Sequence, residues 1–259
     1  MASTGSRRSA DGLGFYGIAN HGAQVEGSLG VSAVRVAAYA RRNTADRPFG
    51  VLNDYVASTL GTAIGLPVPP GTLIRFYQDE PGYLSLGFSD KGDRPPPVIL
   101  QDFARERPWE ASGVIAFDQW VLNTDRHDEN LAYIPTLGVA VFDHDLSLVN
   151  RPPDGNACAS LEAGLDQAVK GHVLAPHLQT SEHFPEWCER IGSIGRREIR
   201  RVVGTCRDAG LIDVATRDKL ASFLEHRQTR VRSYVDRTIS EYVKVTSWTL
   251  GSGEVDDES

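Results

Sequence analysis

Three side chains that carry oxygen ligands stand at short intervals in the middle of this chain. Asp125 precedes Asn130 by five residues, and the strand-like run VAVF leads into Asp143 thirteen residues further on. If the intervening segment folds back as a hairpin, the three side chains converge. Phosphoryl transfer requires a carboxylate that deprotonates the attacking hydroxyl, and an amide and a carboxylate that hold Mg²⁺. Mg²⁺ prefers oxygen ligands and keeps several waters, so two protein ligands suffice.

The acidic segment is also compatible with an ordinary polar turn and with a different class of metal enzyme. An Asp-x-x-x-x-Asn segment alone is more often a polar turn, but the apolar helix before it and the aspartate at a strand end favour a functional site. The His-Asp pairs at 127–128 and 144–145, with His172 and His177 downstream, suggest instead a metal phosphohydrolase of the HD type. Such enzymes are all-helical, whereas the first 90 residues here have a β-rich pattern.

The first part of the chain must supply a sheet and one helix. Residues 1–14 are small and polar, and we expect them to be disordered. VSAVRVAAY has the length and composition of a central strand, and GTLIRFY and YLSLGF are two more strands. NDYVASTLGTAIGL predicts a helix that Asn53 or Asp54 caps and that Gly65 ends. The proline-rich SDKGDRPPPV is the best linker, so residues 15–100 form a predicted N-lobe.

The second part is predicted to be mainly helical. SGVIAFDQWVLNTD has apolar residues at helical spacing, with Ser112 as a plausible cap, and the helix is expected to be largely buried. Asp118 lies inside this helix and must be paired, for which Arg126 is a suitable partner. Residues 101–247 then form a C-lobe and residues 248–259 an acidic tail. The predicted fold class is α+β, with a small β-rich lobe and a larger helical lobe.

Composition restricts the partners of this chain. The 259 residues carry a formal net charge of −7, so no general basic field attracts nucleic acid or an anionic membrane. Three scattered cysteines form no disulfide framework, and no apolar run is long enough to span a membrane. We therefore expect a soluble, cytoplasmic protein that binds neither nucleic acid nor membranes.

The central motifs resemble a known family. TDRHDEN followed by VAVFDHD is similar to the catalytic and metal-binding segments of the HipA-like kinases and, more distantly, of the phosphoinositide kinases. NDYVASTLGTAIGLPVPP resembles the N-lobe helix of the HipA-like family, and FDQWVLNTDRH resembles the helix that enters its catalytic loop. The resemblance covers about residues 34–146 and implies a two-lobed kinase-like fold that binds ATP and Mg²⁺.

This resemblance implies a role for each residue of the acidic segment. Asp125 would be the catalytic base, and Asn130 and Asp143 the Mg²⁺ ligands. His127 would lie near the transferred phosphate, although a histidine bonded within its own loop is an equally good interpretation. Asp128 and Glu129 are expected to be solvated.

The N-lobe departs from the family pattern. Kinases of this shape hold the α- and β-phosphates with a strand lysine that a helix glutamate positions, but no lysine precedes Lys91. The resemblance places Tyr39 near the position of the lysine. Arg35 and Arg41 share a strand face with it at a spacing of two. An arginine can bind phosphate through its fork of donors. Asp54 would replace the glutamate.

The sequence also raises the question of what Asp145 does and which reaction the protein catalyses. Asp145 falls where the family commonly has a small residue, and it adds a third carboxylate beside the metal site. The predicted reaction is Mg²⁺-dependent transfer of the ATP γ-phosphoryl group to a hydroxyl, on Ser or Thr of a protein rather than on a lipid. The alternative is a degenerate kinase-like module that binds nucleotide or a partner protein without turnover.

Overall fold

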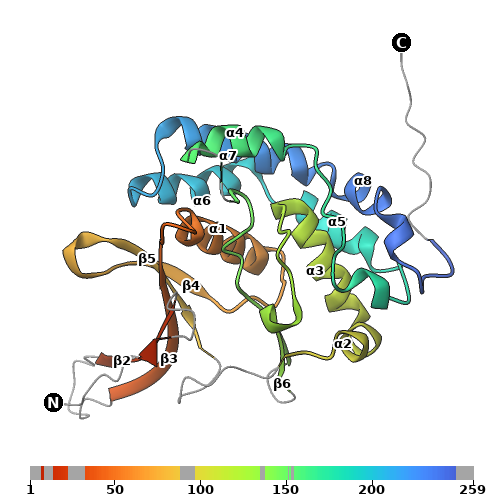
Figure 1. The fold of residues 1–259 in the computed structure, drawn as a ribbon, viewed down its shortest axis with the longest axis horizontal. Coiled ribbons are helices and arrows are strands. Elements are labelled where there is room, and N and C mark those ends of the chain that lie inside the picture. The colour runs from red at the N-terminus through yellow and green to blue at the C-terminus, as the bar shows by residue number, and fades with distance from the viewer. Residues whose placement is uncertain are drawn as a thin grey trace.

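The computed structural model describes residues 7–8, 14–22, 33–87, 97–134, 138–150, 152 and 155–248. A sheet lies at one end and most of the helices gather at the other, with helix α1 (Gly50–Ala63) between them (Figure 1). The predicted α+β fold class with a β-rich and a helical part is confirmed. Residues 89–96 of the predicted linker SDKGDRPPPV (89–98) lie outside the described residues.

The N-lobe contains a five-stranded antiparallel sheet in the order β1-β2-β3-β5-β4. The third strand is central, as VSAVRVAAY predicts, and the two predicted strands GTLIRFY and YLSLGF become β4 and β5, which pair antiparallel. The strand β1, in the segment expected to be disordered, pairs with β2. The strand bounds are β1 (Arg7–Arg8), β2 (Gly14–Gly22), β3 (Ala33–Arg42), β4 (Gly71–Arg75) and β5 (Pro81–Leu86).

Helix α1 packs against β3, β4 and β5 on one side and against α6 (Arg196–Asp208) on the other. It begins at Gly50, three residues before the predicted start, and no side chain caps it. The prediction that Asn53 or Asp54 caps the helix is therefore wrong. Both residues lie one turn inside it, buried, where their side chains bond to the C-lobe instead. Gly65, at φ +82°, ends the helix as expected.

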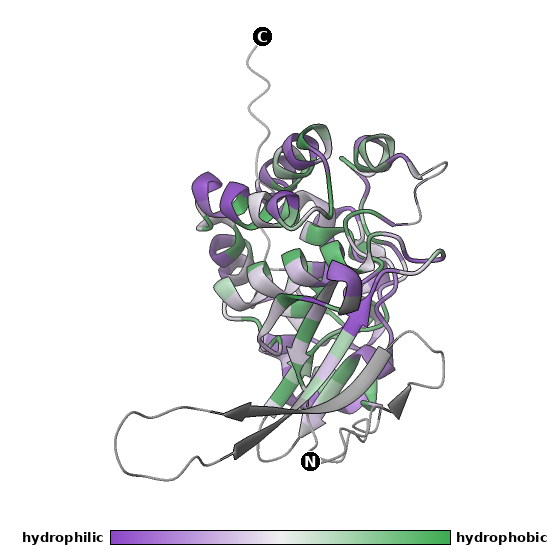
Figure 2. Cartoon of the chain, turned by 90° about the vertical axis from the view of Figure 1, so that its left-hand side faces the viewer, coloured by the Kyte–Doolittle hydropathy of each residue, from purple (hydrophilic) through white to green (hydrophobic). Residues whose placement is uncertain are grey.

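The C-lobe is built around α3 (Pro108–Val121), whose residues from Ala111 to Val121 are all buried. Ser112 does not cap it, because Pro108 occupies the first turn and the Ser112 hydroxyl donates to the Pro108 carbonyl at 2.8 Å. In Figure 2 hydrophilic and hydrophobic turns alternate along the helices farthest from the sheet, as in helices with one buried face. The remaining helices are α2 (Leu100–Glu106), α4 (Ala157–Ala163), α5 (Phe184–Gly192), α7 (Val214–Gln228) and α8 (Val231–Asp236).

A two-stranded hairpin follows the loop after α3 and leads to Asp143. Strand β6 (Leu131–Ile134) pairs with β7 (Gly138–Val141), so the chain folds back as the sequence predicts. The amide of Val141 donates to the carbonyl of Pro67 at 2.8 Å, which ties the hairpin to the N-lobe. Short 3₁₀ turns complete the secondary structure: η1 (Tyr77–Asp79), η2 (Asp128–Asn130), η4 (Ala175–His177) and η5 (Ile239–Glu241). Within the described residues, no helix has the length and apolar character that crossing a bilayer requires.

Candidate active site

The loop that carries Asp125 is fixed by hydrogen bonds to the end of helix α3. Helix α3 ends at Val121, and Leu122 reverses the chain in the left-handed region at φ +52°. The Asn123 side chain then accepts a hydrogen bond from the Asp125 amide at 3.1 Å and donates to a carboxylate oxygen of Asp118, also at 3.1 Å. The backbone of Asp125 is thus fixed to the buried helix, while its carboxylate side is exposed.

Arg126 connects this loop to the hairpin. Its guanidinium binds both carboxylate oxygens of Asp118, at 2.8 and 2.9 Å, so the predicted pair is confirmed. The same side chain donates to the carbonyls of Asn130 and Phe142. Since these carbonyls belong to one proposed metal ligand and to the neighbour of the other, Asp143, one buried arginine sets the spacing of both strand ends.

His172 completes the surroundings of Asp118. Its Nδ1 accepts from the Leu174 amide at 3.2 Å, so Nε2 carries the proton and donates to Asp118 at 3.1 Å. Burial disfavours the charged carboxylate, but Arg126 and His172 outweigh it and hold the pKa of Asp118 well below its usual range. This carboxylate is therefore a fully paired structural anion.

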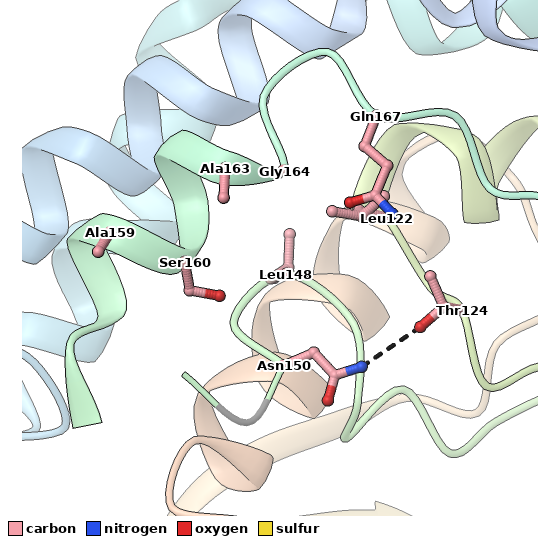
Figure 3. Close-up of a pocket in the computed structure, with 9 residues that line it drawn as sticks. All are labelled: Leu122, Thr124, Leu148, Asn150, Ala159, Ser160, Ala163, Gly164 and Gln167. Carbon is pink, nitrogen blue, oxygen red and sulfur yellow. Dashed lines mark hydrogen bonds between the residues drawn. The ribbon is translucent and has the colours of Figure 1, made fainter. Parts of the chain in front are cut away.

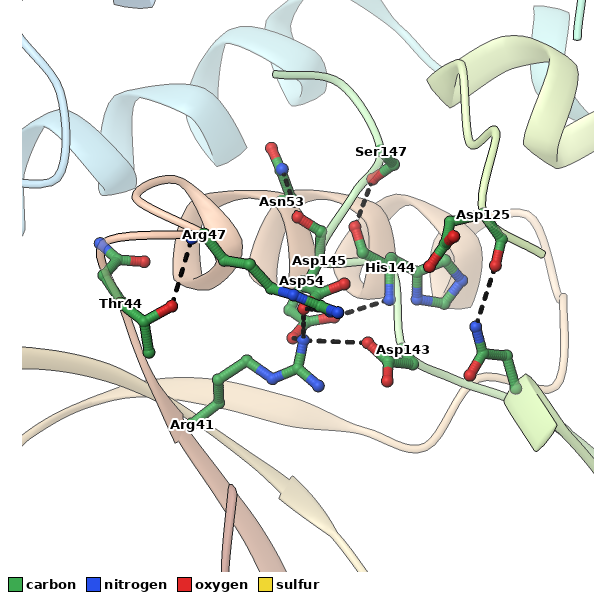
Figure 4. A network of polar contacts seen from close by, with 12 residues as sticks. Arg41, Thr44, Arg47, Asn53, Asp54, Asp125, Asp143, His144, Asp145 and Ser147 are labelled. Carbon is green, nitrogen blue, oxygen red and sulfur yellow. Dashed lines mark hydrogen bonds and ion pairs between the residues drawn. The ribbon is translucent and has the colours of Figure 1, made fainter. Parts of the chain in front are cut away.

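Hydrogen bonds to the backbone link the segments that carry Asp125, Asn130 and Asp143. The Asn130 side chain donates to the Asp125 carbonyl at 3.2 Å, and the Phe142 amide donates to the Asn130 carbonyl at 3.2 Å. Asp143 follows immediately, with φ +58°, a left-handed conformation that costs about 1–3 kcal/mol and marks functional sites. In Figure 4 Asp143 lies beside Arg41, and Asp125 lies on the neighbouring loop. His127 is half-buried between Arg126 and the turn η2.

The oxygen donors of Asn130 and Asp143 suit Mg²⁺ better than a transition metal. The described residues contain no group of three or more His, Cys, Asp or Glu side chains arranged to hold a metal. Asn130 and Asp143 supply one amide and one carboxylate, and an ion that keeps most of its waters needs no more. The donor set therefore fits Mg²⁺ held by few protein ligands.

Arg41 is the cation that faces Asp143 from the N-lobe. Its Nη1 lies 3.3 Å from a carboxylate oxygen of Asp54 and 2.9 Å from one of Asp143, and it also pairs with Asp145. The Arg41 side chain is 6% exposed. Its carboxylate partners come from α1 and from the segment after β7, so the arginine joins both lobes (Figure 4).

The other two proposed phosphate-binding residues of β3 differ from Arg41. Tyr39 is near Arg41, but its hydroxyl accepts hydrogen bonds from Arg41 Nε and Nη2, at 3.3 and 3.0 Å. Tyr39 thus orients the cation, and burial raises the pKa of its hydroxyl to about 12. Arg35 pairs with Asn20 in the sheet, and its side chain lies outside the described residues. Arg41 thus places its charge at Asp54, and Tyr39 supports it.

Helix α1 is bonded directly to the segment after β7. The amide of His144 donates to Asp54 at 2.8 Å. The Asn53 side chain donates to the carbonyls of Asp145 and Val149, at 2.7 and 3.1 Å, and accepts from the Val149 amide. Two consecutive helix residues, expected as caps, therefore dock the helix on the metal-binding segment.

This cluster carries more negative than positive charge. Asp54, Asp143 and Asp145 face two guanidiniums, those of Arg41 and Arg47, and Arg47 pairs with Asp145. Burial, together with the other two carboxylates, raises the pKa of Asp54 to about 7 despite Arg41. Burial acts in the same direction on Asp143, but Arg41 outweighs it and holds the pKa of Asp143 below its usual range.

Arg47 was not among the sequence-predicted site residues. It lies in the turn between β3 and α1, where NTADRPFG has the composition of an ordinary polar loop. Asp145, an extra carboxylate after an apolar strand, was the only sequence feature that could have suggested such a residue, because a buried acid needs a cationic partner. Nothing in the sequence pattern indicates which of the nearby arginines would reach it.

His144 does not belong to a metal centre. Its ring is fully buried edge-on against Phe117, with 5.6 Å between ring centroids, and neither ring nitrogen has a hydrogen-bond partner among the described residues. Burial lowers its pKa to about 3, so the ring is neutral. His172 bonds to Asp118 and not to a shared ion. Together with the β-rich N-lobe, these positions argue against the all-helical phosphohydrolase.

A pocket of about 490 Å³ lies beside the catalytic loop (Figure 3). Asn150 donates to the hydroxyl of Thr124, the residue before Asp125, at 3.3 Å, and this contact forms one wall. The described residues that line it carry no charged side chain, and most of them come from the loop, the segment after β7 and α4: Leu122, Thr124, Leu148, Asn150, Ala159, Ser160, Ala163, Gly164 and Gln167.

Comparison with known proteins identifies the fold. No family model and no curated protein sequence matches the chain. Among solved structures, the proinflammatory kinase CtkA of Helicobacter pylori superposes with a TM-score of 0.52 over 89% of this chain and 97% of that chain, at 13% identity. HipA in its complex with HipB and operator DNA from Shewanella oneidensis covers 92% of this chain and 67% of that chain at 11% identity, with a TM-score of 0.41. The chain therefore has a kinase-like fold, as the sequence resemblance predicted.

Proposed function

We propose that this protein is a Mg²⁺-dependent kinase that transfers the γ-phosphoryl group of ATP to a hydroxyl. The observation that carries the proposal is the Arg41–Asp54 ion pair, whose guanidinium also contacts Asp143. In kinases a strand lysine binds the nucleotide phosphates, and a helix glutamate pairs with that lysine and positions it. Here arginine and aspartate would perform the same function in place of lysine and glutamate.

Each residue of the site then has one role. Asp125, exposed on a loop whose backbone is fixed, would accept the proton of the acceptor hydroxyl. Asn130 and Asp143 would hold Mg²⁺, which neutralises phosphate charge when it is bound. Arg41 would bind phosphate oxygens, with Tyr39 and Asp54 fixing its direction. His127, two residues after Asp125, would contact the transferred phosphate.

The uncharged pocket supports a protein acceptor rather than a phosphoinositide. Its wall includes Thr124, so an acceptor bound there would approach Asp125. A lipid headgroup with several phosphates would need cations in the lining, and none of the described residues that line the pocket is charged. We therefore propose Ser or Thr of a protein as the acceptor, with an uncharged neighbouring residue seated between Leu148 and α4. Bulk at Ala163, as in Ala163→Leu, should then raise KM for the protein acceptor and leave KM for ATP unchanged.

Calorimetric titration with ATP, with and without Mg²⁺, tests the nucleotide site before any acceptor is known. The wild-type protein is expected to bind ATP more tightly with Mg²⁺ present, and Asp143→Ala should remove that difference. Absence of ATP binding under both conditions would contradict the proposal.

Turnover is tested by a matched pair of loop variants. Asp125→Asn should lower the rate of phosphoryl transfer by roughly 10²–10⁴-fold, the contribution of a general base, and leave ATP affinity unchanged. Asp128→Asn makes the same charge change three residues away and should keep the rate of the wild type. An equal loss of folding in both variants would mean that the acidic loop is structural.

One observation favours the second candidate, a nucleotide-binding module without turnover. Arg41 pairs with Asp143, the proposed metal ligand, at 2.9 Å, so the cation and Mg²⁺ compete for one carboxylate. In that case the wild type would bind ATP, no acceptor would be phosphorylated, and Asp125→Asn would change neither property.

A further inference from the structure

Two arginines from different elements meet at one carboxylate. Arg41, at the end of β3, and Arg47, in the following turn, each place Nη1 on the same Oδ2 atom of Asp145. Like charges repel at such a separation, so their convergence needs a strong local anion. Asp145 supplies part of it, and it is 2% exposed.

Arg47 is the accessible member of this pair. Its side chain is 24% exposed, whereas that of Arg41 is 6% exposed. Its turn is anchored, because the Arg47 amide donates to the Thr44 hydroxyl at 3.2 Å and the Gly50 amide donates to the Arg47 carbonyl at 3.3 Å. Figure 4 shows its side chain extending from this turn toward Asp145 and Asp143, above Arg41. A guanidinium with one edge on Asp145 keeps further N–H donors for a ligand.

Charge compensation alone would assign Arg47 a simpler role. Asp145 adds one negative charge to the pair Asp54 and Asp143, and Arg47 adds one positive charge that offsets it. Arg47 would then only neutralise Asp145, and the two residues could be removed together without loss. The partial exposure of Arg47 does not fit this role, because a purely compensating cation has no need to be exposed.

We propose that Arg47 is a second phosphate-binding residue and that Asp145 holds Arg41 and Arg47 side by side as a two-arginine clamp for the polyphosphate of the nucleotide. This inference rests on the proposed function. An arginine fork binds phosphate oxygens in a fixed geometry that a lysine does not reproduce. The clamp would therefore replace one flexible point charge with two preorganised forks.

The test is a binding cycle of Arg47→Gln, Asp145→Asn and the double variant, titrated with ATP, ADP and adenosine in the presence of Mg²⁺. Arg47→Gln should weaken ATP binding roughly tenfold to hundredfold, the worth of one charge-assisted contact, and leave adenosine binding unchanged. The double variant should remain as weak as Arg47→Gln. Arg42→Gln is the matched control, since Arg42 lies at the same strand end and pairs with Glu80 at 3.3 Å, away from the cluster.

Two results would overturn the inference. If the double variant binds ATP as tightly as the wild type, Arg47 only compensates charge. If Arg47→Gln weakens adenosine and ATP equally, the loss is one of folding, which unfolding curves of each variant and the milder Arg47→Lys would show. Failure of the wild type to bind ATP would instead remove the proposed function and this inference with it.

Discussion

The structure contains two buried arginine–carboxylate clusters, and they differ in how fully their charges are paired. Around Asp118, each carboxylate oxygen accepts bonds from Arg126 and from a second donor, Asn123 or His172. Around Arg41, three carboxylates compete for two guanidiniums. Burial acts on both clusters, yet the pKa of Asp118 is lowered and that of Asp54 is raised.

This difference in charge pairing indicates that one cluster holds the structure together and that the other can accept a ligand. A buried anion with every lone pair satisfied stabilises the loop that it holds and has no capacity for a ligand. A buried cluster with excess negative charge is stabilised by any cation that enters, and Asp143 stands at its open side. The Asp118 cluster therefore fixes the loop that carries Asp125, and the Arg41 cluster is the part that, in the proposed function, would respond to Mg²⁺ and nucleotide.

The largest effect on stability is expected at the scaffold. Arg126→Gln leaves Asp118 without its main partner in a fully buried position, where breaking an ion pair costs about 3–5 kcal/mol. The free energy of unfolding, measured with urea, should fall by that amount. A loss below about 1 kcal/mol would show that the Asp118 cluster is not a scaffold.

Arg41→Gln should have a smaller effect on stability and a specific effect on binding. At pH 8 the unfolding free energy should fall by about 1–3 kcal/mol, because three carboxylates lose a shared cation. Lowering the pH should recover part of this loss, since protonation of Asp54 relieves the repulsion. ATP affinity should not recover at low pH, because the phosphate contact is gone. If the unfolding free energy and the ATP affinity of Arg41→Gln both recover at low pH, Arg41 does not bind phosphate and the Arg41 cluster is not the nucleotide site.

Asp54 predicts a pH dependence of opposite sign to that of Asp118. Its pKa is raised from 3.8 to about 7 in the folded protein, so its contribution to stability is fully present below about pH 4. Between about pH 4 and 7 the unfolded chain releases the proton first, and the contribution is lost with a slope of up to ~1.4 kcal/mol per pH unit. Asp54→Asn should remove this slope in ligand-free protein. A slope that persists in Asp54→Asn would assign it to another group.

The smallest effect is expected at the exposed pair of Arg42 and Glu80, each 41% exposed. Arg42→Gln should change the unfolding free energy by less than about 1 kcal/mol, as for surface ion pairs in general. It should leave ATP affinity unchanged. A large effect would mean that charge anywhere at this end of β3, and not the buried geometry, governs the site.

Much of the arrangement follows from local sequence. Length and β-favouring composition predicted the strands β3, β4 and β5, and apolar residues at helical spacing predicted the buried helix α3. The Asp118–Arg126 pair was predictable from the rule that an acid on a buried helix face must find a cation nearby in the chain. The hairpin between Asn130 and Asp143 was also predictable from the sequence, and β6 and β7 form it.

Tertiary structure alone decided which cation faces Asp54 and what α1 does with its polar residues. Strand alternation placed Tyr39 and Arg41 on one face, but only packing against α1 shows that Arg41 reaches the carboxylates and Tyr39 supports it. Asn53 and Asp54 have the residue types of helix caps, and their partners lie about 90 residues away. The Arg47–Asp145 pair spans 98 residues. Contacts of that separation depend on how the two lobes meet, which no local pattern encodes.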